Sequence, residues 1–356
     1  MRFVFVGDVA LGDHPKTVGF GFYSKYRNGI PMAKAVKIFP DFIEADITFG
    51  NLEFALDTEE VYGNSPRDVQ CKGVREFVRF LEAAGFDVLS VANNHIYEGG
   101  IELFANTLEC LGNVGIRVCG TPRDFRKDSI IEVGDETALI LGWCERPRQG
   151  FRENPPYNEV EDVDSCLDRI REAKTVADVV CVSLHWGDEF IQIPSDRERL
   201  IARRMIKSGA KIVIGHHPHV LREIEEYNGG LIAYSLGNFI GDMVWNRRTR
   251  ETGCLFVEFK KGSLVHWKLH PAFIGNDFFP VYLDEDSGQA FMSGLSSLFV
   301  ALQRSLKSSN YTTLAKKALR RHQALTSLFF LKNMHKYRPN FVFQILRDAL
   351  VSRLGY

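Results

Sequence analysis

Acidic, amide and imidazole side chains follow five short apolar segments of this 356-residue chain. The run in "FVFVGD" ends at Asp8, and the run in "KIVIGHHPH" ends at a histidine cluster. The segments "ITFGNLE", "VLSVANNH" and "VVCVSLHWGDE" end in the same way. The polar residues after the five runs include Asp8, Asn51, Glu53, Asn94, His95, His185, His217 and His219. Carboxylate oxygens and imidazole nitrogens are ligands that Zn, Mn or Fe accept, so these residue types predict a divalent metal site.

Short β-rich runs alternate with amphipathic helical stretches over the first part of the chain, and this alternation predicts how the polar residues are positioned. We expect strands at residues 2–6, 47–49, 88–91, 116–119, 129–133, 138–141, 179–184 and 212–214. We expect helices at residues 74–85, 100–112, 163–173 and 195–209. Such alternation indicates βαβ units and a largely parallel sheet, in which the carboxyl ends of the strands share one edge. The five polar clusters should therefore meet at one rim.

The pattern changes in the last third of the chain. Two hairpins are predicted, around residues 228–230 and 261–263, and helices follow at 295–306, 312–331 and 340–354. We therefore expect an α/β domain over residues 1–284 and a helical extension over 285–356. Residues 289–356 hold eleven Lys and Arg against one acid, Asp348. The extension is expected to pack on the body with its basic residues in water, or to contact a partner protein or a membrane surface.

Composition excludes several classes of protein. The chain is 45% hydrophobic and 25% charged, which is typical of a soluble globular protein. It has no run of 18 uncharged apolar residues, so no transmembrane segment is expected. Seven cysteines without a CxxC pair favour a reducing, cytoplasmic location. Because no P-loop, Rossmann fingerprint or serine elbow is present, and basic residues lack interleaved aromatics, neither nucleotide-cofactor chemistry nor nucleic-acid binding is predicted.

Six motifs, taken in order, resemble those of the CapA-type capsule and poly-γ-glutamate synthesis family, a branch of the calcineurin-like metallophosphoesterase superfamily. They are "GDVALG", "GNLE", "AAGFDVLSVANNHIYEGG", "SLHWGDE", "GHHPHV" and "YSLGNF". The resemblance extends from about residue 2 to about residue 271. It implies a four-layer α-β-β-α sandwich with a site at the strand ends. It also implies metal ligands at Asp8, Glu53, Asn94, His185, His217 and His219.

The same resemblance implies roles for residues beside the metal ligands. His95 stands where the superfamily has its phosphate-facing histidine, with Glu98 at the acidic position after it, and Asn51 is a further substrate contact. One departure concerns Ala10, which occupies the histidine position of the usual Asp-x-His motif. The resemblance therefore leaves open whether one cation or two are bound, and whether Mn, Zn or Fe is used.

Three arginines follow other predicted strand ends, at Arg146, Arg247 and Arg248. They are candidates for binding an anionic small molecule, peptide or polymer, because a guanidinium pairs with phosphate or carboxylate, although a solvated charged loop is an equal alternative. The leading hypothesis is a metal-dependent hydrolase of a phosphoester or related acyl or peptide bond, with His95 protonating the leaving group. A metal-free isomerase or epimerase at the same rim is one alternative. A non-catalytic partner of a polyglutamate-type ligase or transporter is another.

Overall fold

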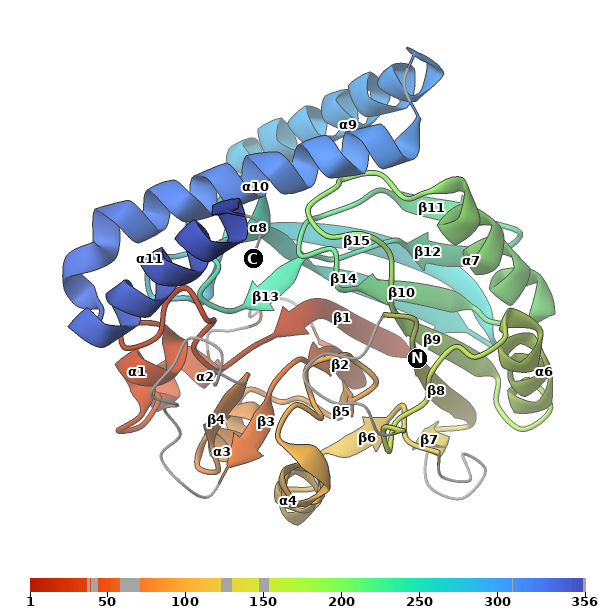
Figure 1. The fold of residues 1–356 in the computed structure, drawn as a ribbon. Helices are drawn as coiled ribbons and strands as arrows, with labels where there is room; N and C mark the ends of the chain where they lie inside the picture. Colours follow the sequence, from red (N-terminus) through yellow and green to blue (C-terminus); the bar gives the residue numbers. More distant parts are fainter. Residues whose placement is uncertain are drawn as a thin grey trace.

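Two β-sheets packed face to face form the body of the protein (Figure 1). The structure is a computed structural model, and it describes residues 1–36, 39, 44–57, 71–122, 130–146, 154–308 and 310–354. The first sheet has the order β16-β15-β14-β1-β2-β5-β6, with β13 also paired to β1. Its strands are β1 (Arg2–Val9), β2 (Ile47–Leu52), β5 (Val88–Ser90), β6 (Arg117–Cys119), β13 (Asn238–Ile240), β14 (Glu251–Lys260), β15 (Ser263–Ile274) and β16 (Pro280–Tyr282). The strands β1, β2, β5 and β6 are parallel, as predicted.

The second sheet has the order β11-β12-β10-β9-β8-β7. Its strands are β7 (Ile130–Val133), β8 (Glu136–Cys144), β9 (Val179–His185), β10 (Ile212–His216), β11 (Ile224–Tyr227) and β12 (Gly230–Ala233). The four central strands are parallel, and the edge strands β7 and β11 are antiparallel to their neighbours. Residue 129, where a strand was predicted to begin, lies outside the described residues. A small separate sheet pairs β3 (Ala55–Asp57) with β4 (Lys72–Val74), and the sequence pattern did not predict it.

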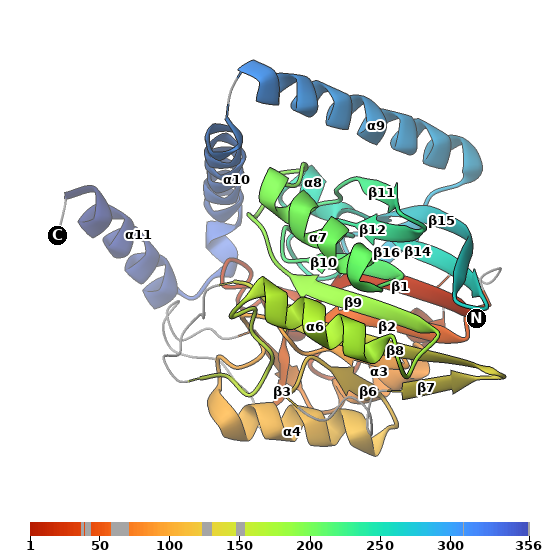
Figure 2. The ribbon, with the colours of Figure 1, turned by 90° about the vertical axis from the view of Figure 1, so that its right-hand side faces the viewer.

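Alternation along the strands explains the layers. In β1, Phe3 and Phe5 enter the core between the sheets, whereas Val4 and Val6 face the helices of the first sheet. Strands buried on both faces appear in the sequence as continuous apolar runs. Burying a side chain of this size contributes about 1.5–3 kcal/mol. The sheets are covered by α3 (Phe77–Ala83), α4 (Gly100–Asn113), α6 (Val163–Ala173) and α7 (Asp196–Ser208) (Figure 2). The predicted four-layer α-β-β-α sandwich is therefore confirmed.

Local signals set several element boundaries. Ser195 caps α7 through a capping box with Glu198, and Gly209 follows the helix with a φ of 127°. Both predicted hairpins are present, because β11 pairs with β12 and β14 pairs with β15. Asn228 adopts a left-handed φ of 50° in the first of these turns, a conformation that asparagine tolerates better than most residues. Turn chemistry therefore fixes the register of these strands.

The chain ends in three long helices, α9 (Glu285–Ser308), α10 (Tyr311–Asn333) and α11 (Pro339–Leu354), with a short 3₁₀ turn, η1 (Met334–Lys336), before the last. The first begins ten residues earlier than predicted, because the Asp284 carboxylate accepts a hydrogen bond from the Ser287 amide and starts the helix. Figure 2 shows α9 crossing beside β11 and β15. The division into two domains at residue 284 stays a prediction. Within the described ranges, no helix is both long enough and apolar enough to cross a membrane.

Candidate metal centre and its cavity

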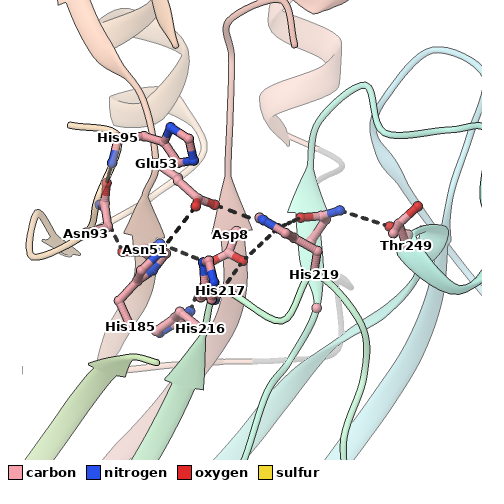
Figure 3. Close-up of polar contacts among 12 residues, drawn as sticks. Asp8, Asn51, Glu53, Asn93, His95, His185, His216, His217, His219 and Thr249 are labelled. Carbon is pink, nitrogen blue, oxygen red and sulfur yellow. Dashed lines mark hydrogen bonds and ion pairs between the residues drawn. The ribbon is translucent and has the colours of Figure 1, made fainter. Parts of the chain in front are cut away.

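The carboxyl ends of strands from both sheets converge on one cluster of buried polar side chains (Figure 3). Asp8 and Asn51 lie opposite each other in β1 and β2, and His185 and His216 lie opposite each other in β9 and β10. These pairs come from different sheets. Because parallel strands end at the same edge, the sandwich brings Asp8 and His217, which are 209 positions apart, into contact.

Asp8 is at the centre of this cluster and is 1% exposed. The Asn51 amide donates to its Oδ1 at 2.9 Å, and the His217 backbone N–H donates to its Oδ2 at 3.3 Å. The Nδ1 atom of His219 lies 3.4 Å from Oδ2. Burial opposes ionisation, but the contacts with His216 and His219 hold the pKa of Asp8 well below its usual range. Asp8 is therefore a carboxylate with fixed orientation.

Glu53 lies between imidazoles of both sheets. Its Oε1 atom is 3.4 Å from His185 Nε2, and its Oε2 atom is 3.9 Å from His219 Nδ1. His185 Nε2 also lies 2.7 Å from the amide oxygen of Asn94. Burial, and next the charge of Asp8, raise the pKa of Glu53 to about 8. Without a cation, Glu53 therefore holds a proton at neutral pH.

The two histidines after β10 have left-handed backbones, with φ 90° at His217 and 56° at His219. Residues other than glycine adopt this region at a cost, and such strain is frequent at functional sites. His219 Nδ1 lies 2.9 Å from the amide oxygen of Asn238, whose Nδ2 donates to the Thr249 carbonyl. Burial opposes protonation of His219, but Glu53 and Asp8 raise its pKa to about 9. The strained turn thus aims both rings at the carboxylates.

Unpaired polar atoms in this cluster match the needs of a divalent cation. Both ring nitrogens of His217 are buried and have no hydrogen-bond partner in the described structure, and the same is true of Glu53 Oε1. Glu53, His185 and His217 each offer a ligand atom, and these atoms lie within 4.8 Å of one another. Asp8, Glu53 and His219 form a second such group. Native proteins rarely leave buried polar atoms unpaired, so the donor set fits a metal ion.

The asparagines of the "ANNH" segment build the turn that presents His95. The Asn93 side chain donates to the Leu52 carbonyl at 2.8 Å and accepts from the His95 amide at 3.2 Å. His95 Nδ1 lies 2.6 Å from Glu98 Oε1, and Glu98 Oε2 accepts from the Cys71 amide at 3.0 Å. Burial opposes protonation of His95, but the contacts with Cys71 and Glu98 raise its pKa well above the usual value. His95 is thus held as a proton donor.

A cavity of about 690 Å³ opens directly above this cluster. Glu53, His95, Glu98 and His219 line its inner part. Its outer wall comes from the loop after β1 and from α10, which is about 300 residues away in sequence. A cavity of this size accepts a small molecule or a short section of a polymer.

A family model described as "Bacterial capsule synthesis protein PGA_cap" matches residues 2–243, about two thirds of the chain. The chain belongs to the PGA_cap family. It is 32% identical over 273 residues to the "PGA biosynthesis protein CapA" of Bacillus subtilis (strain 168), covering 75% of this chain and 70% of that protein. It is 30% identical over 255 residues to the "Capsule biosynthesis protein CapA" of Bacillus anthracis, and the match covers 68% of this chain and 60% of that protein. A hypothetical protein from Thermus thermophilus, of known crystal structure, is 17% identical with a TM-score of 0.46, covering 76% of this chain and 98% of that one.

Within this PGA_cap chain, the structure brings together most of the residues that the sequence singled out. The six expected metal ligands, Asp8, Glu53, Asn94, His185, His217 and His219, form one buried cluster. His95 and Glu98 line the cavity above it. Asn51 lies inside the cluster, fully buried, where it holds Asp8 rather than facing the cavity. Their roles as ligands and catalytic groups stay predictions.

Each of the three arginines pairs with an acidic side chain. Arg247 Nε is 3.2 Å and Arg248 Nη1 is 2.8 Å from the carboxylate of Glu251, a buried residue at the start of β14. Arg146 lies 3.9 Å from Asp188. None of the three is among the described residues that line the cavity, so their expected contact with substrate gains no support. A lysine, Lys16, does line it, although no sequence motif marks this residue.

Proposed function

We propose that this protein is a metal-dependent hydrolase that cleaves a phosphoester or a related acyl or peptide bond in capsule or poly-γ-glutamate synthesis. One observation carries the proposal. Buried carboxylates and imidazoles from both sheets meet beneath the cavity, and His217 has two ring nitrogens without a partner in the described residues. Membership of the PGA_cap family and the names of the Bacillus relatives support the pathway. The expected substrate is anionic.

The residues that would hold the cation are Asp8, Glu53, Asn94, His185, His217 and His219. When bound, a divalent cation polarises the scissile group and lowers the pKa of a bound water to about 7. The protein fixes the ligands through outer contacts, since Asn51 orients Asp8 and Asn238 orients His219. Glu53 belongs to two ligand groups, so it is placed to serve either one cation or two.

His95 would supply the proton that the leaving group needs. It lines the cavity, and its raised pKa keeps the imidazole protonated at neutral pH. Glu98 accepts from one ring nitrogen and so orients the other nitrogen away from itself. As the bond to the leaving oxygen or nitrogen breaks, the proton passes from His95 to that atom. Such positioned acids contribute about 10²–10⁴ in rate.

One observation favours a second candidate, a metal-independent isomerase or epimerase. Glu53 has a pKa of about 8. Burial lowers the pKa of His185 well below its usual value, although the charge of Asp8 opposes this shift. The two groups lie 3.4 Å apart, so a protonated acid and a neutral imidazole are neighbours without any cation. This pair could transfer a proton to and from a carbon acid. Activity that survives exhaustive chelation would support this candidate over the hydrolase.

The test combines elemental analysis with a screen of three bond types. Full-length protein is loaded separately with Mn, Zn and Fe, and then offered a chromogenic phosphodiester, a phosphomonoester and a γ-glutamyl anilide. We expect at least one metal to bind stoichiometrically and one bond type to be cleaved. His217→Ala should lose both metal and activity. His266→Ala, which changes an exposed histidine of β15, should retain both.

Two results would contradict the proposed hydrolase activity. The first is full metal content in the His217→Ala protein, because the cluster would then not be the metal centre. The second is a metal-loaded protein that cleaves none of the three bonds, which would favour a non-catalytic partner of a ligase or transporter. The two results are distinguishable because metal content and turnover are measured separately.

A further inference from the structure

The loop after β1 is held rigidly at the edge of the cavity. The buried Asp242 carboxylate accepts hydrogen bonds from Thr17 Oγ1 at 2.5 Å and from the backbone amides of His14 and Phe22 at 3.1 Å. A Cβ atom on Gly21 would lie only 2.2 Å from that same carboxylate, so the loop closes tightly around it. Residues 14–22 are therefore preorganised, and any side chain that this loop directs into the cavity has a defined position.

Lys16 is the cationic residue that this loop places in the cavity lining. Its backbone is held on two sides, because its amide donates to His14 Nδ1 at 3.0 Å and its carbonyl accepts from the Tyr337 hydroxyl. Its ammonium group has no ion pair or hydrogen bond with any residue that the structure describes. It is also partly buried, and a partly desolvated cation without a partner favours an anionic ligand.

Another part of the cavity wall comes from one face of α10. The residues of this face that line the cavity are Leu319, His322, Gln323, Thr326 and Ser327. They are spaced at three, four, seven and eight residues, which places them on a single stripe of the helix. A helix that only packs on a protein body normally turns an apolar stripe inward. Here four of the five side chains are polar, and this is the composition expected of a ligand-binding wall.

His322 fixes this stripe in position. Its ring stacks on Phe190, with centroids 3.5 Å apart and planes inclined by 3°. Its Nδ1 atom accepts from the Asn246 side-chain amide at 3.2 Å, so the neutral ring carries its proton on Nε2. Farther along the helix, Phe329 packs on Trp245 with centroids 5.1 Å apart. These contacts tie α10 to the loops beside the metal centre, so the helix is part of the cavity.

We propose that Lys16 and the polar stripe of α10 form an anion-binding subsite that holds a carboxylate or phosphate group of the substrate away from the reacting bond. Lys16 supplies the positive charge, and the side-chain amide of Gln323 donates hydrogen bonds. The hydroxyl groups of Thr326 and Ser327 donate to the His322 and Gln323 carbonyls in this structure, so each would rotate to donate to the anion. The family match ends at residue 243, so the α10 half of the subsite lies outside the matched segment. The inference rests on the proposed function only in placing the reacting bond at the metal centre.

The test measures binding without turnover, in the full-length protein both as purified and after chelation. The probes are a tripeptide of γ-linked glutamates, its fully amidated neutral analogue and inorganic phosphate. We expect the anionic tripeptide to bind at least about tenfold more tightly than the amidated one, as expected for one specific ion pair. Lys16→Met should remove this preference, and Lys16→Arg should retain most of it. Lys317→Met, on the exposed face of α10, should change nothing.

A second variant, Gln323→Ala with Thr326→Val, should weaken binding of the tripeptide while Lys16 is intact. Displacement of the tripeptide by phosphate in wild type but not in Lys16→Met would show that the subsite accepts phosphate, and lack of displacement would assign it to carboxylates. Equal affinity of wild type and folded Lys16→Met for the anionic tripeptide would overturn the proposal. So would a wild-type protein that binds both tripeptides equally. Either result is independent of whether the metal centre hydrolyses anything.

Discussion

Replacing His217 by leucine separates the metal-ligand role of this residue from a structural one. The imidazole is 1% exposed, and neither ring nitrogen has a hydrogen-bond partner within the described part of the chain. A buried polar group without a partner costs about 1–3 kcal/mol. Leucine has a similar volume and no polar atom, and the left-handed φ of 90° strains both residues. In the absence of metal, the free energy of unfolding of His217→Leu should therefore exceed that of wild type by roughly 1–3 kcal/mol.

With metal the difference in stability between the variant and wild type should close or reverse. A cation that binds only the native state, present at about 100 times its dissociation constant, stabilises wild type by about 2.7 kcal/mol. The variant lacks a ligand and should gain little. Urea unfolding of both proteins, with chelator and with the metal that wild type binds, measures all four free energies. His266→Leu is the matched control, since the same change is made on an exposed residue of β15.

His217 is not a metal ligand if His217→Leu is less stable than wild type in chelator by more than about 2 kcal/mol and still gains the full increment from metal. His217 would then be a core residue that supports the turn after β10. The metal centre would have to be assembled from the remaining carboxylates and imidazoles, and the fit drawn from its unpaired nitrogens would be wrong.

Two further predictions concern groups around the cavity. Burial, and then the charge of Asp13, raise the pKa of Asp242 to about 7, so the native chain keeps a proton that an unfolded chain releases near pH 4. Native stability should therefore fall as the pH rises between these values, by up to roughly 4 kcal/mol. Asp242→Asn should flatten this slope in urea midpoints measured across the range, and equal slopes in the two proteins would contradict the assignment. Glu98→Gln should lower hydrolysis at neutral pH, by at most the factor of about 10²–10⁴ that a positioned acid contributes. It should also shift the loss of the active protonated His95 to lower pH, because the imidazole loses its anionic partner. Metal content should stay unchanged in this variant, and a parallel loss of metal would show that Glu98 supports the centre instead.

Much of the fold and of the polar cluster at the strand ends was predictable, because the signals are local. An apolar run followed at once by Asp8, or by His217 and His219, marks a buried strand and its carboxyl end together. Parallel pairing then requires those ends to meet, whatever the packing details. The capping box at Ser195 and the Asn228 turn are also local, and both are present. The start of α9 was missed because its first turns carry few apolar residues, so periodicity was weak there.

The roles of the basic side chains were harder to predict from the sequence. Arg247 and Arg248 follow a strand as a substrate-binding pair would, but Glu251 lies three and four residues farther on and pairs with them. Lys16 has no motif around it, and its place in the cavity depends on Asp242, 226 residues later in the chain. Charge alone therefore did not identify which basic side chain faces the ligand.

The amino-acid sequence by itself determined the chemistry at the strand ends, because residue type and strand period are properties of a few adjacent positions. Only the tertiary structure decided that α10 closes the cavity. The stacking of His322 on Phe190 and the contact of Tyr337 with Lys16 join positions more than a hundred residues apart. Such contacts depend on how complete layers pack, and a helical stripe with polar residues is consistent with a solvated face until its neighbour is known.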